Sequence, residues 1–243
     1  MIQLPEAVTV LSKEGNRAVF EIAPLMPGYG PTLANPLRRI LLSSLEGAAI
    51  TSVKIRGVDH EFSTIPGVAE DIIQLIINVK KIRLRSFSQE PIVLILRAKG
   101  EEMITARDIQ TTPDVEIINE DQPIATLTNK KAEFEMELTV EKGVGYVPVE
   151  QRQKGKLPIG MISIDAIFSP VKLVNFRVDD IRVGQQIDFN KVTMEIETDG
   201  TIAPEAALKR ASEILVEHFN IIAQVSIAAS EPSLRKSKSK KVI

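Results

Sequence analysis

Helical and strand-like hydrophobic patterns occupy different parts of this chain, and their distribution is the strongest constraint on its fold. Helical periodicity appears at residues 34–46, 67–80 and 204–226, whereas most other segments alternate as strands do. The segment AEFEMELTVEKG alternates four apolar residues with glutamates, which predicts a strand with one buried face and one acidic face. We therefore expect an α+β protein of two subdomains, in which the largely β middle is inserted into a unit built from both chain ends.

The first helix is predicted from its end signals as well as from its periodicity. Asn35 is a favoured N-cap residue, and Pro36 then follows where a missing N–H costs nothing. Gly47 stands where a left-handed C-cap would end the helix. One broad face gathers the residues expected to pack inward, namely Leu33, Leu37, Ile40, Leu41, Ser44 and Leu45.

A second face of this helix carries Arg38, Arg39 and Leu42, away from the apolar stripe. Such a face is either a solvated surface with one stray leucine or a second contact surface, because arginine is enriched at protein interfaces. Periodicity alone favours the solvated surface.

The other two helices differ in how completely their own chain can cover them. The second has Glu70 and Asp71 in its expected first turn and Lys80 near its end, as suits the helix dipole. The third starts near Pro204 and is apolar on more than one side, because Phe219 and others lie off its main stripe. A terminal helix of this kind is expected to need a partner subunit.

Residue types that build active sites are scarce. The 243 residues include no cysteine and only two histidines, His60 and His218, of which His218 is expected to pack on the last helix's stripe. Neither a zinc set nor a phosphate-binding glycine loop is recognisable. No catalytic residue, metal or cofactor is therefore expected. The absence of a signal-peptide pattern or a long apolar run makes a cytoplasmic location, with no membrane contact, the default expectation.

Charge is distributed unevenly. Residues 231–243 hold five basic residues and one acidic one, leaving 25 basic against 31 acidic residues elsewhere. The composition of the tail is most typical of a flexible linker. Strong DNA binding is not expected, because the rest of the chain is acidic. Two alternatives remain open. One is a stand-alone nucleic-acid-binding α+β module that uses the tail, and the other is an enzyme with a phosphate site near Gly143 and Gly145.

Several long motifs carry a resemblance to a known family. The stretch GYGPTLANPLRRILLSSLEGAAITSVKIRGVDHEFSTIPGVAEDIIQLIINVKKIRLR closely resembles the amino-terminal region of the alpha subunit of bacterial or plastid RNA polymerase. The motifs TARDI, DVEIIN, EKGVGYVP, PIGMISIDAIFSPV and MEIETDGTIAPEAALKRASEIL follow in the family's order. The resemblance covers roughly residues 5–226 and identifies the chain as a member of this family.

The resemblance implies a homodimer and a division of the chain into subdomains with different roles. It implies a dimerisation subdomain at 1–46 plus 172–230, an inserted β-rich subdomain at 47–171, and a basic flexible tail at 231–243. The family's first and last helices meet their copies across a two-fold axis. The positions implied for this dimer interface are Tyr29, Leu33, Ile40, Leu215 and Phe219.

The resemblance also implies contacts with the two large polymerase subunits. Arg39 and Leu42, with Arg38 as a weaker candidate, match positions that contact the beta subunit, which favours the contact-surface interpretation of that face. Lys80 and Ile164 match positions that contact the beta-prime subunit. The implied function is assembly: the dimer would recruit beta first and beta-prime second, and the catalytic aspartates would lie on those other chains. Family members usually continue into a helical DNA-binding domain, so the tail implies either a truncated chain or a naturally short form.

Overall fold

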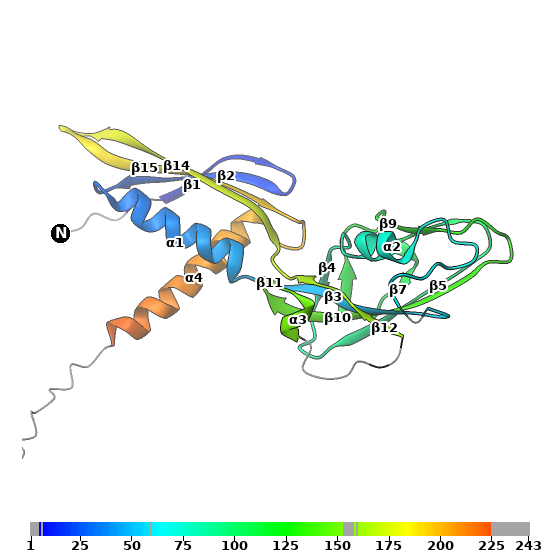
Figure 1. The fold of residues 1–243 in the computed structure, drawn as a ribbon. Coiled ribbons are helices and arrows are strands. Elements are labelled where there is room, and N and C mark those ends of the chain that lie inside the picture. The colour runs from blue at the N-terminus through cyan, green and yellow to red at the C-terminus, as the bar shows by residue number, and fades with distance from the viewer. Residues whose placement is uncertain (1–4, 6, 59, 153–157, 159, 225–243) are drawn as a thin grey trace, which may run out of the picture.

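The computed structural model describes residues 5, 7–58, 60–152, 158 and 160–224, and it shows two groups of elements side by side (Figure 1). Each group has its own sheet and its own cluster of buried apolar residues. The predicted α+β fold with two subdomains is confirmed. The basic tail at 231–243 lies outside the described residues.

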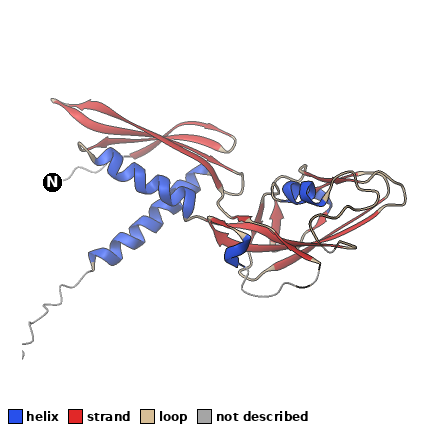
Figure 2. Cartoon of the chain, viewed as in Figure 1, coloured by secondary structure: helices blue, strands red, loops and turns tan. Residues whose placement is uncertain are grey.

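One group combines elements from both ends of the chain, and we call it the end-built subdomain. Its antiparallel sheet has the strand order β1-β2-β15-β14. Both long helices lie on one side of this sheet (Figure 2). Its elements are β1 (Ala7–Glu14), β2 (Arg17–Leu25), α1 (Tyr29–Ser43), β14 (Val171–Val183), β15 (Gln186–Thr198) and α4 (Pro204–Ala223).

The other group, which we call the inserted subdomain, is mostly β-structure. Its main sheet has the strand order β12-β3-β10-β5-β7, and three two-stranded sheets surround it. Its elements are β3 (Glu46–Ile55), α2 (Ile72–Val79), β4 (Leu84–Ser86), β5 (Ile92–Lys99), β6 (Met103–Thr105), η1 (Ala106–Asp108), β7 (Ile109–Gln110), β8 (Val115–Ile117), β9 (Pro123–Thr126), β10 (Glu133–Val144), β11 (Tyr146–Val147), α3 (Val149–Arg152), β12 (Met161–Ser163) and β13 (Ala166–Ile167).

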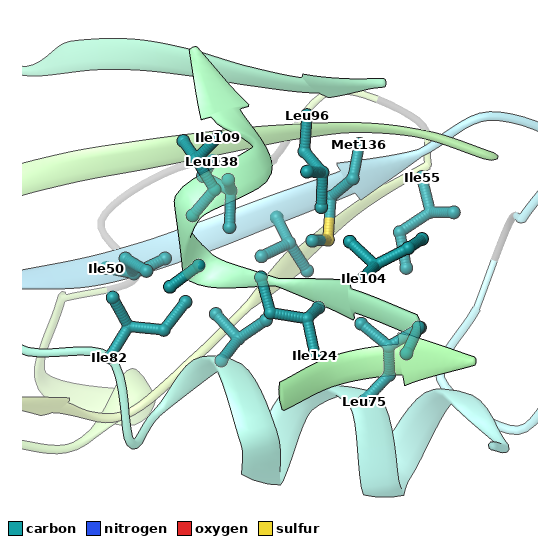
Figure 3. Packing of buried hydrophobic residues seen from close by; sticks show 14 of the residues in the cluster. Ile50, Ile55, Leu75, Ile82, Leu96, Ile104, Ile109, Ile124, Met136 and Leu138 are labelled. Carbon is teal, nitrogen blue, oxygen red and sulfur yellow. The ribbon is translucent and has the colours of Figure 1, made fainter. Parts of the chain in front are cut away.

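The alternating segment becomes the central strand of the inserted sheet. β10 pairs with both β3 and β5, so that Leu138 lies opposite Val53 on one side and Leu94 on the other. Its apolar residues point into the core, where Leu75 of α2 lies on the far side (Figure 3). The glutamates of β10 point the other way, and two of them pair with basic residues of the neighbouring strands: Glu133 with Lys99 (2.9 Å) and Glu135 with Arg97 (2.7 Å). The predicted division into a buried and an acidic face is confirmed.

The predicted start of the first helix is wrong. The helix begins at Tyr29, with Gly28 as a left-handed N-cap (φ 82°), and Pro36 lies inside it. The side-chain oxygen of Asn190 accepts hydrogen bonds from the N–H groups of Gly28 (2.9 Å) and Gly30 (3.2 Å). These N–H groups have no partner within the helix, so a distant strand caps it instead. The local Asn35–Pro36 signal could not reveal that contact.

Of the other two helices, α2 begins later than predicted, whereas α4 begins where it was predicted. α2 begins at Ile72, because Asp71 caps it by accepting the Gln74 N–H (2.7 Å). Glu70 instead accepts the Thr126 N–H (2.7 Å), which links the preceding loop to β9. α4 starts at Pro204 as expected and is described to Ala223, so residues 225–226 of the predicted helix lie outside the described part.

Gly47 does not cap the first helix; it lies in β3, at the junction of the two subdomains. A Cβ atom at this position would overlap the backbone carbonyl oxygen of Phe168, which lies on the segment that leads back toward β14. The chain therefore leaves the end-built subdomain and returns to it at one place, where only glycine allows the two backbones to approach so closely.

Substituting Gly47 with alanine is expected to lower the free energy of unfolding by about 3 kcal/mol, because the added methyl group must displace backbone atoms. Urea denaturation monitored by circular dichroism measures this change. Gly184→Ala is the matched control: Gly184 has a positive φ of 62° but nothing within 4 Å of its Cβ position, so we expect a loss of only about 1 kcal/mol. Equal losses in the two variants would contradict the packing explanation.

Candidate docking surfaces

The arginine face of α1 lies beside the apolar stripe and is partly tied to the sheet. Ala34, Leu37 and Leu41 form the buried face of the helix. Arg38 is exposed, yet its Nε–H donates to the backbone carbonyl of Val174 on β14 (3.1 Å). One member of the pair therefore has a structural contact within its own chain.

Arg39 and Leu42 form the more available part of this face. Arg39 is exposed, and among the described residues its guanidinium has no hydrogen-bond or ion-pair partner. Leu42, one turn further along α1, is half-buried and packs against the edge of the core, so it is less isolated than the helical wheel predicts. Residues three apart on a helix share a face. The two side chains thus present a cation next to a partly covered apolar surface.

The second half of α4 exposes several large apolar side chains. α4 crosses α1 and extends away from the sheet (Figure 1). Its buried residues all lie in its first half, and none follows Ala211. The exposed apolar residues of its second half are Val216 (56%), Phe219 (58%), Ile221 (72%) and Ile222 (65%).

The residues expected at a dimer interface lie on α1 and α4. Phe219 and Leu33 are exposed, whereas Tyr29, Ile40 and Leu215 are half-buried against the end-built core. The helical wheel predicted that Leu33 packs into the core of its own chain, and this prediction is wrong. His218 is not packed either: it is exposed, and its Nδ1–H donates to the backbone carbonyl of Ile214 (2.7 Å).

Lys80 closes α2 and pairs with Asp165 on the segment between β12 and β13. The Lys80 Nζ lies 3.1 Å from an Asp165 oxygen, and the other oxygen accepts the Val149 N–H (3.1 Å). Both side chains remain about one-third exposed (29% and 34%). Ile164, by contrast, is 2% exposed and belongs to the inserted core. The structure therefore brings Lys80 to the surface together with Asp165 and places the Ile164 side chain in the core.

The Val149 N–H and the Lys80 ammonium group hold the pKa of the Asp165 carboxyl below its usual range. A lowered pKa in the folded state stabilises the fold at neutral pH, and this contribution is lost as pH falls from about 3.9 through the folded-state value. Lys80→Met is expected to raise the pKa of Asp165 part of the way back, because the Val149 hydrogen bond remains. Carboxyl-carbon NMR titration measures the change.

Lys81→Met is the matched control for this titration, since Lys81 is the adjacent, exposed lysine. It removes the same charge without removing the hydrogen bond. An unchanged Asp165 pKa in Lys80→Met would contradict the pairing.

Gly143 and Gly145, near which a phosphate site was one alternative, both contact Phe168 closely. A Cβ atom on Gly143 would come within 2.6 Å of the Phe168 ring. The carbonyl of Gly145 accepts the Phe168 N–H (2.8 Å). Their backbone thus holds the junction segment.

The two histidines lie on different subdomains, and both are exposed. Within the described ranges, no three His, Cys, Asp or Glu side chains lie close enough together to hold a metal ion. In the same part of the chain, no helix is both long enough and apolar enough to cross a membrane.

Sequence reasoning missed Asp165 as the partner of Lys80. Its signal was available: Asp165 is the single charged residue in the otherwise apolar and small run from Met161 to Phe168. An isolated carboxylate in such a run indicates a specific partner, because unpaired charge is costly there. The identity of that partner, 85 residues away in sequence, depends on the fold.

Comparison with known proteins agrees with the motifs. Residues 53–169 match the family model described as "RNA polymerase Rpb3/RpoA insert domain". The DNA-directed RNA polymerase subunit alpha of Roseiflexus sp. (strain RS-1) is 48% identical over 230 residues, which cover 95% of this chain and 70% of the relative. The subunit of the same name from Desulforudis audaxviator is 52% identical over 211 residues, which cover 87% and 67%.

A third relative has the same name and nearly the same coverage. The subunit alpha of Symbiobacterium thermophilum is 48% identical over 229 residues, covering 94% of this chain and 72% of the relative. Identity at this level over almost the whole chain shows common ancestry, and the chain belongs to the family of alpha subunits of bacterial DNA-directed RNA polymerase.

Proposed function

We propose that this polymerase subunit is a non-catalytic assembly platform: it forms a homodimer, and the dimer then binds the beta and beta-prime subunits. Its subdomains carry separate surfaces for these contacts, with the dimer and beta surfaces on the end-built subdomain and the beta-prime surface on the inserted subdomain. Catalysis of RNA synthesis is assigned to the other chains, in the cytoplasm of a bacterium.

The exposed apolar half of α4 is the observation that carries the dimer proposal. A helix that leaves its subdomain with Phe219, Ile221 and Ile222 uncovered needs a second apolar surface. A second copy supplies one, because in an isologous interface each copy contributes the same patch. Leu33 and Tyr29 on α1 are proposed to pack against the opposite α4. An interface burying about 2,000 Å² would suit an obligate dimer.

The face formed by Arg38, Arg39 and Leu42 is the proposed beta surface. A guanidinium has five N–H donors in a planar arrangement, which suits backbone carbonyls and carboxylates of a partner. Arg39 has all of these donors available among the described residues, whereas Arg38 already donates to Val174. Arg39 is therefore proposed as the main anchor and Arg38 as a lesser contact.

The Lys80–Asp165 pair is the proposed beta-prime surface. A partly exposed ion pair offers both charges to a partner without requiring either to be buried alone. The buried Ile164 is proposed to support Asp165 from below rather than to contact beta-prime with its own side chain.

Stepwise mixing tests the proposed function. The chain is mixed with purified beta, with purified beta-prime, and with both, and each mixture is separated by size exclusion. The proposal predicts that beta is retained by the chain alone and that beta-prime joins only when beta is present. Retention of beta-prime without beta, or of neither subunit, would contradict the proposed order.

A further inference from the structure

We propose that Arg85 is a positioning residue that fixes the angle between the two subdomains, and thereby the spacing between the beta surface on α1 and the beta-prime surface at Lys80. The part that concerns spacing rests on the proposed function. The part that concerns the angle rests on the contacts of the chain itself.

The covalent connections between the subdomains leave the angle poorly constrained. The chain crosses at the start of β3 and again just before β14, and Gly47 and Phe168 hold these two crossings side by side. Two adjacent crossings act as a hinge, because one subdomain can rotate relative to the other about a line through both crossings without stretching either connecting segment. A fixed angle requires further contacts between the two subdomains.

Arg85 supplies such a contact from the inserted subdomain. It lies on β4, where its Nη1 pairs with Glu116 on the neighbouring strand β8 (3.1 Å). Its Nε–H donates to the backbone carbonyl of Thr201, and its Nη2 donates to that of Gly200 (3.4 Å). Both carbonyls belong to the end-built subdomain, between β15 and α4. One guanidinium therefore links a strand pair of one subdomain to a loop of the other.

The loop that Arg85 holds is itself well fixed. A carboxylate oxygen of Asp199 accepts the N–H (2.9 Å) and the hydroxyl (2.5 Å) of Thr201. Gly200 has a φ of 98°, and a Cβ atom on it would lie 3.2 Å from Ile118 of the inserted subdomain. α4 begins three residues after Thr201. Holding this loop thus fixes where the start of α4 lies relative to the inserted subdomain.

Arginine suits this role better than lysine does. Its planar group can donate to two adjacent carbonyls and a carboxylate at once, whereas an ammonium group is a point charge without this fixed geometry. We therefore expect the angle between the two subdomains to vary widely in Arg85→Ala and to vary less widely in Arg85→Lys. The dissociation constants of the dimer and of its complex with beta are expected to stay within twofold of the parent values, because the surfaces proposed for both contacts lie on the end-built subdomain.

Loss of the contact is expected to weaken beta-prime capture. If the correct angle is populated only part of the time, the apparent affinity falls by that fraction. We expect the complex of the dimer with beta to bind beta-prime about three- to tenfold more weakly when it carries Arg85→Ala. Arg97→Ala is the matched control, because Arg97 is an exposed arginine of the same subdomain that pairs with Glu135 on the neighbouring strand.

Distance measurement by electron spin resonance tests the angle directly. The chain has no cysteine, so spin labels can be placed at Asp188→Cys on β15 and Glu101→Cys in the inserted subdomain, both exposed. Labelled chain is co-refolded with an excess of unlabelled chain, so that distances within one chain dominate. Thermal melting checks that each variant is folded.

The proposal predicts one narrow distance distribution in the parent chain and in Arg97→Ala, a broad or shifted one in Arg85→Ala, and an intermediate one in Arg85→Lys. Unchanged distributions in both Arg85 variants would overturn it. A broadened distribution with unchanged beta-prime capture would overturn only the link to assembly, and with it the proposed beta-prime surface. Because the distances are measured without beta or beta-prime, the two failures are distinguishable.

Discussion

Phe219→Ala is expected to convert a dimer into a monomer at micromolar concentration. Phe219 is 58% exposed in one chain, so most of its side chain remains to be buried by a second copy. Burying a large apolar side chain contributes about 1.5 kcal/mol or more. Because the proposed dimer has two-fold symmetry, one substitution removes this side chain from both copies. The dimer should therefore weaken by about 3 kcal/mol, or roughly 150-fold. Sedimentation velocity over a dilution series measures the dissociation constant.

Phe62→Ala is the matched control for the dimer. Phe62 is also an exposed phenylalanine (77%), but it lies on the inserted subdomain. Its removal is expected to leave the dimer constant unchanged. Circular dichroism should show both variants folded, because neither side chain is part of a buried cluster. A Phe219→Ala chain that stays dimeric to the same dilution as the parent would place the interface elsewhere.

Arg39→Ala is expected to abolish most of the affinity for beta while leaving the dimer intact. A buried arginine anchor at an interface contributes about 2–4 kcal/mol, which corresponds to a roughly 30- to 1,000-fold weaker complex. Arg39 has no partner among the described residues, so its loss removes no contact within the chain and should not destabilise the fold. Titration of the chain onto immobilised beta measures the affinity.

Arg17→Ala controls for the loss of a positive charge. Arg17 is a surface arginine of the same subdomain, 58% exposed and paired with Glu195 on the neighbouring strand. It lies on β2, away from α1, and its substitution is expected to change beta affinity by less than twofold. If Arg39→Ala and Arg17→Ala behave alike, Arg39 is an ordinary solvated arginine and the proposed surface is wrong.

The type and order of the main elements could be predicted from the sequence because their periodicity is local. The strand that became β10 alternates regularly, and the helix that became α4 has Pro204 at its start. The beginning of α1 could not be predicted, because its capping group is the side chain of Asn190, about 160 residues away. Gly47 was misassigned for a similar reason: its role depends on the carbonyl of Phe168.

The candidate surfaces divide in the same way. A helical wheel placed Arg39 on an exposed face and showed that α4 has more apolar residues than one contact can cover. It could not show that Arg38 is tied to Val174, that Lys80 is paired with Asp165, or that Arg85 reaches the loop before α4. Each of these contacts joins residues far apart in sequence, so residue type and spacing alone carry no trace of the partner.

The mass of the unmodified chain in solution tests the central claim most directly. Light scattering after size exclusion, at micromolar concentration, is expected to give twice the 26.8 kDa mass of one chain. The same two chains are expected within the complex that forms when beta is added. A chain that is monomeric and still captures beta would contradict the account, because the platform would then not require a second copy.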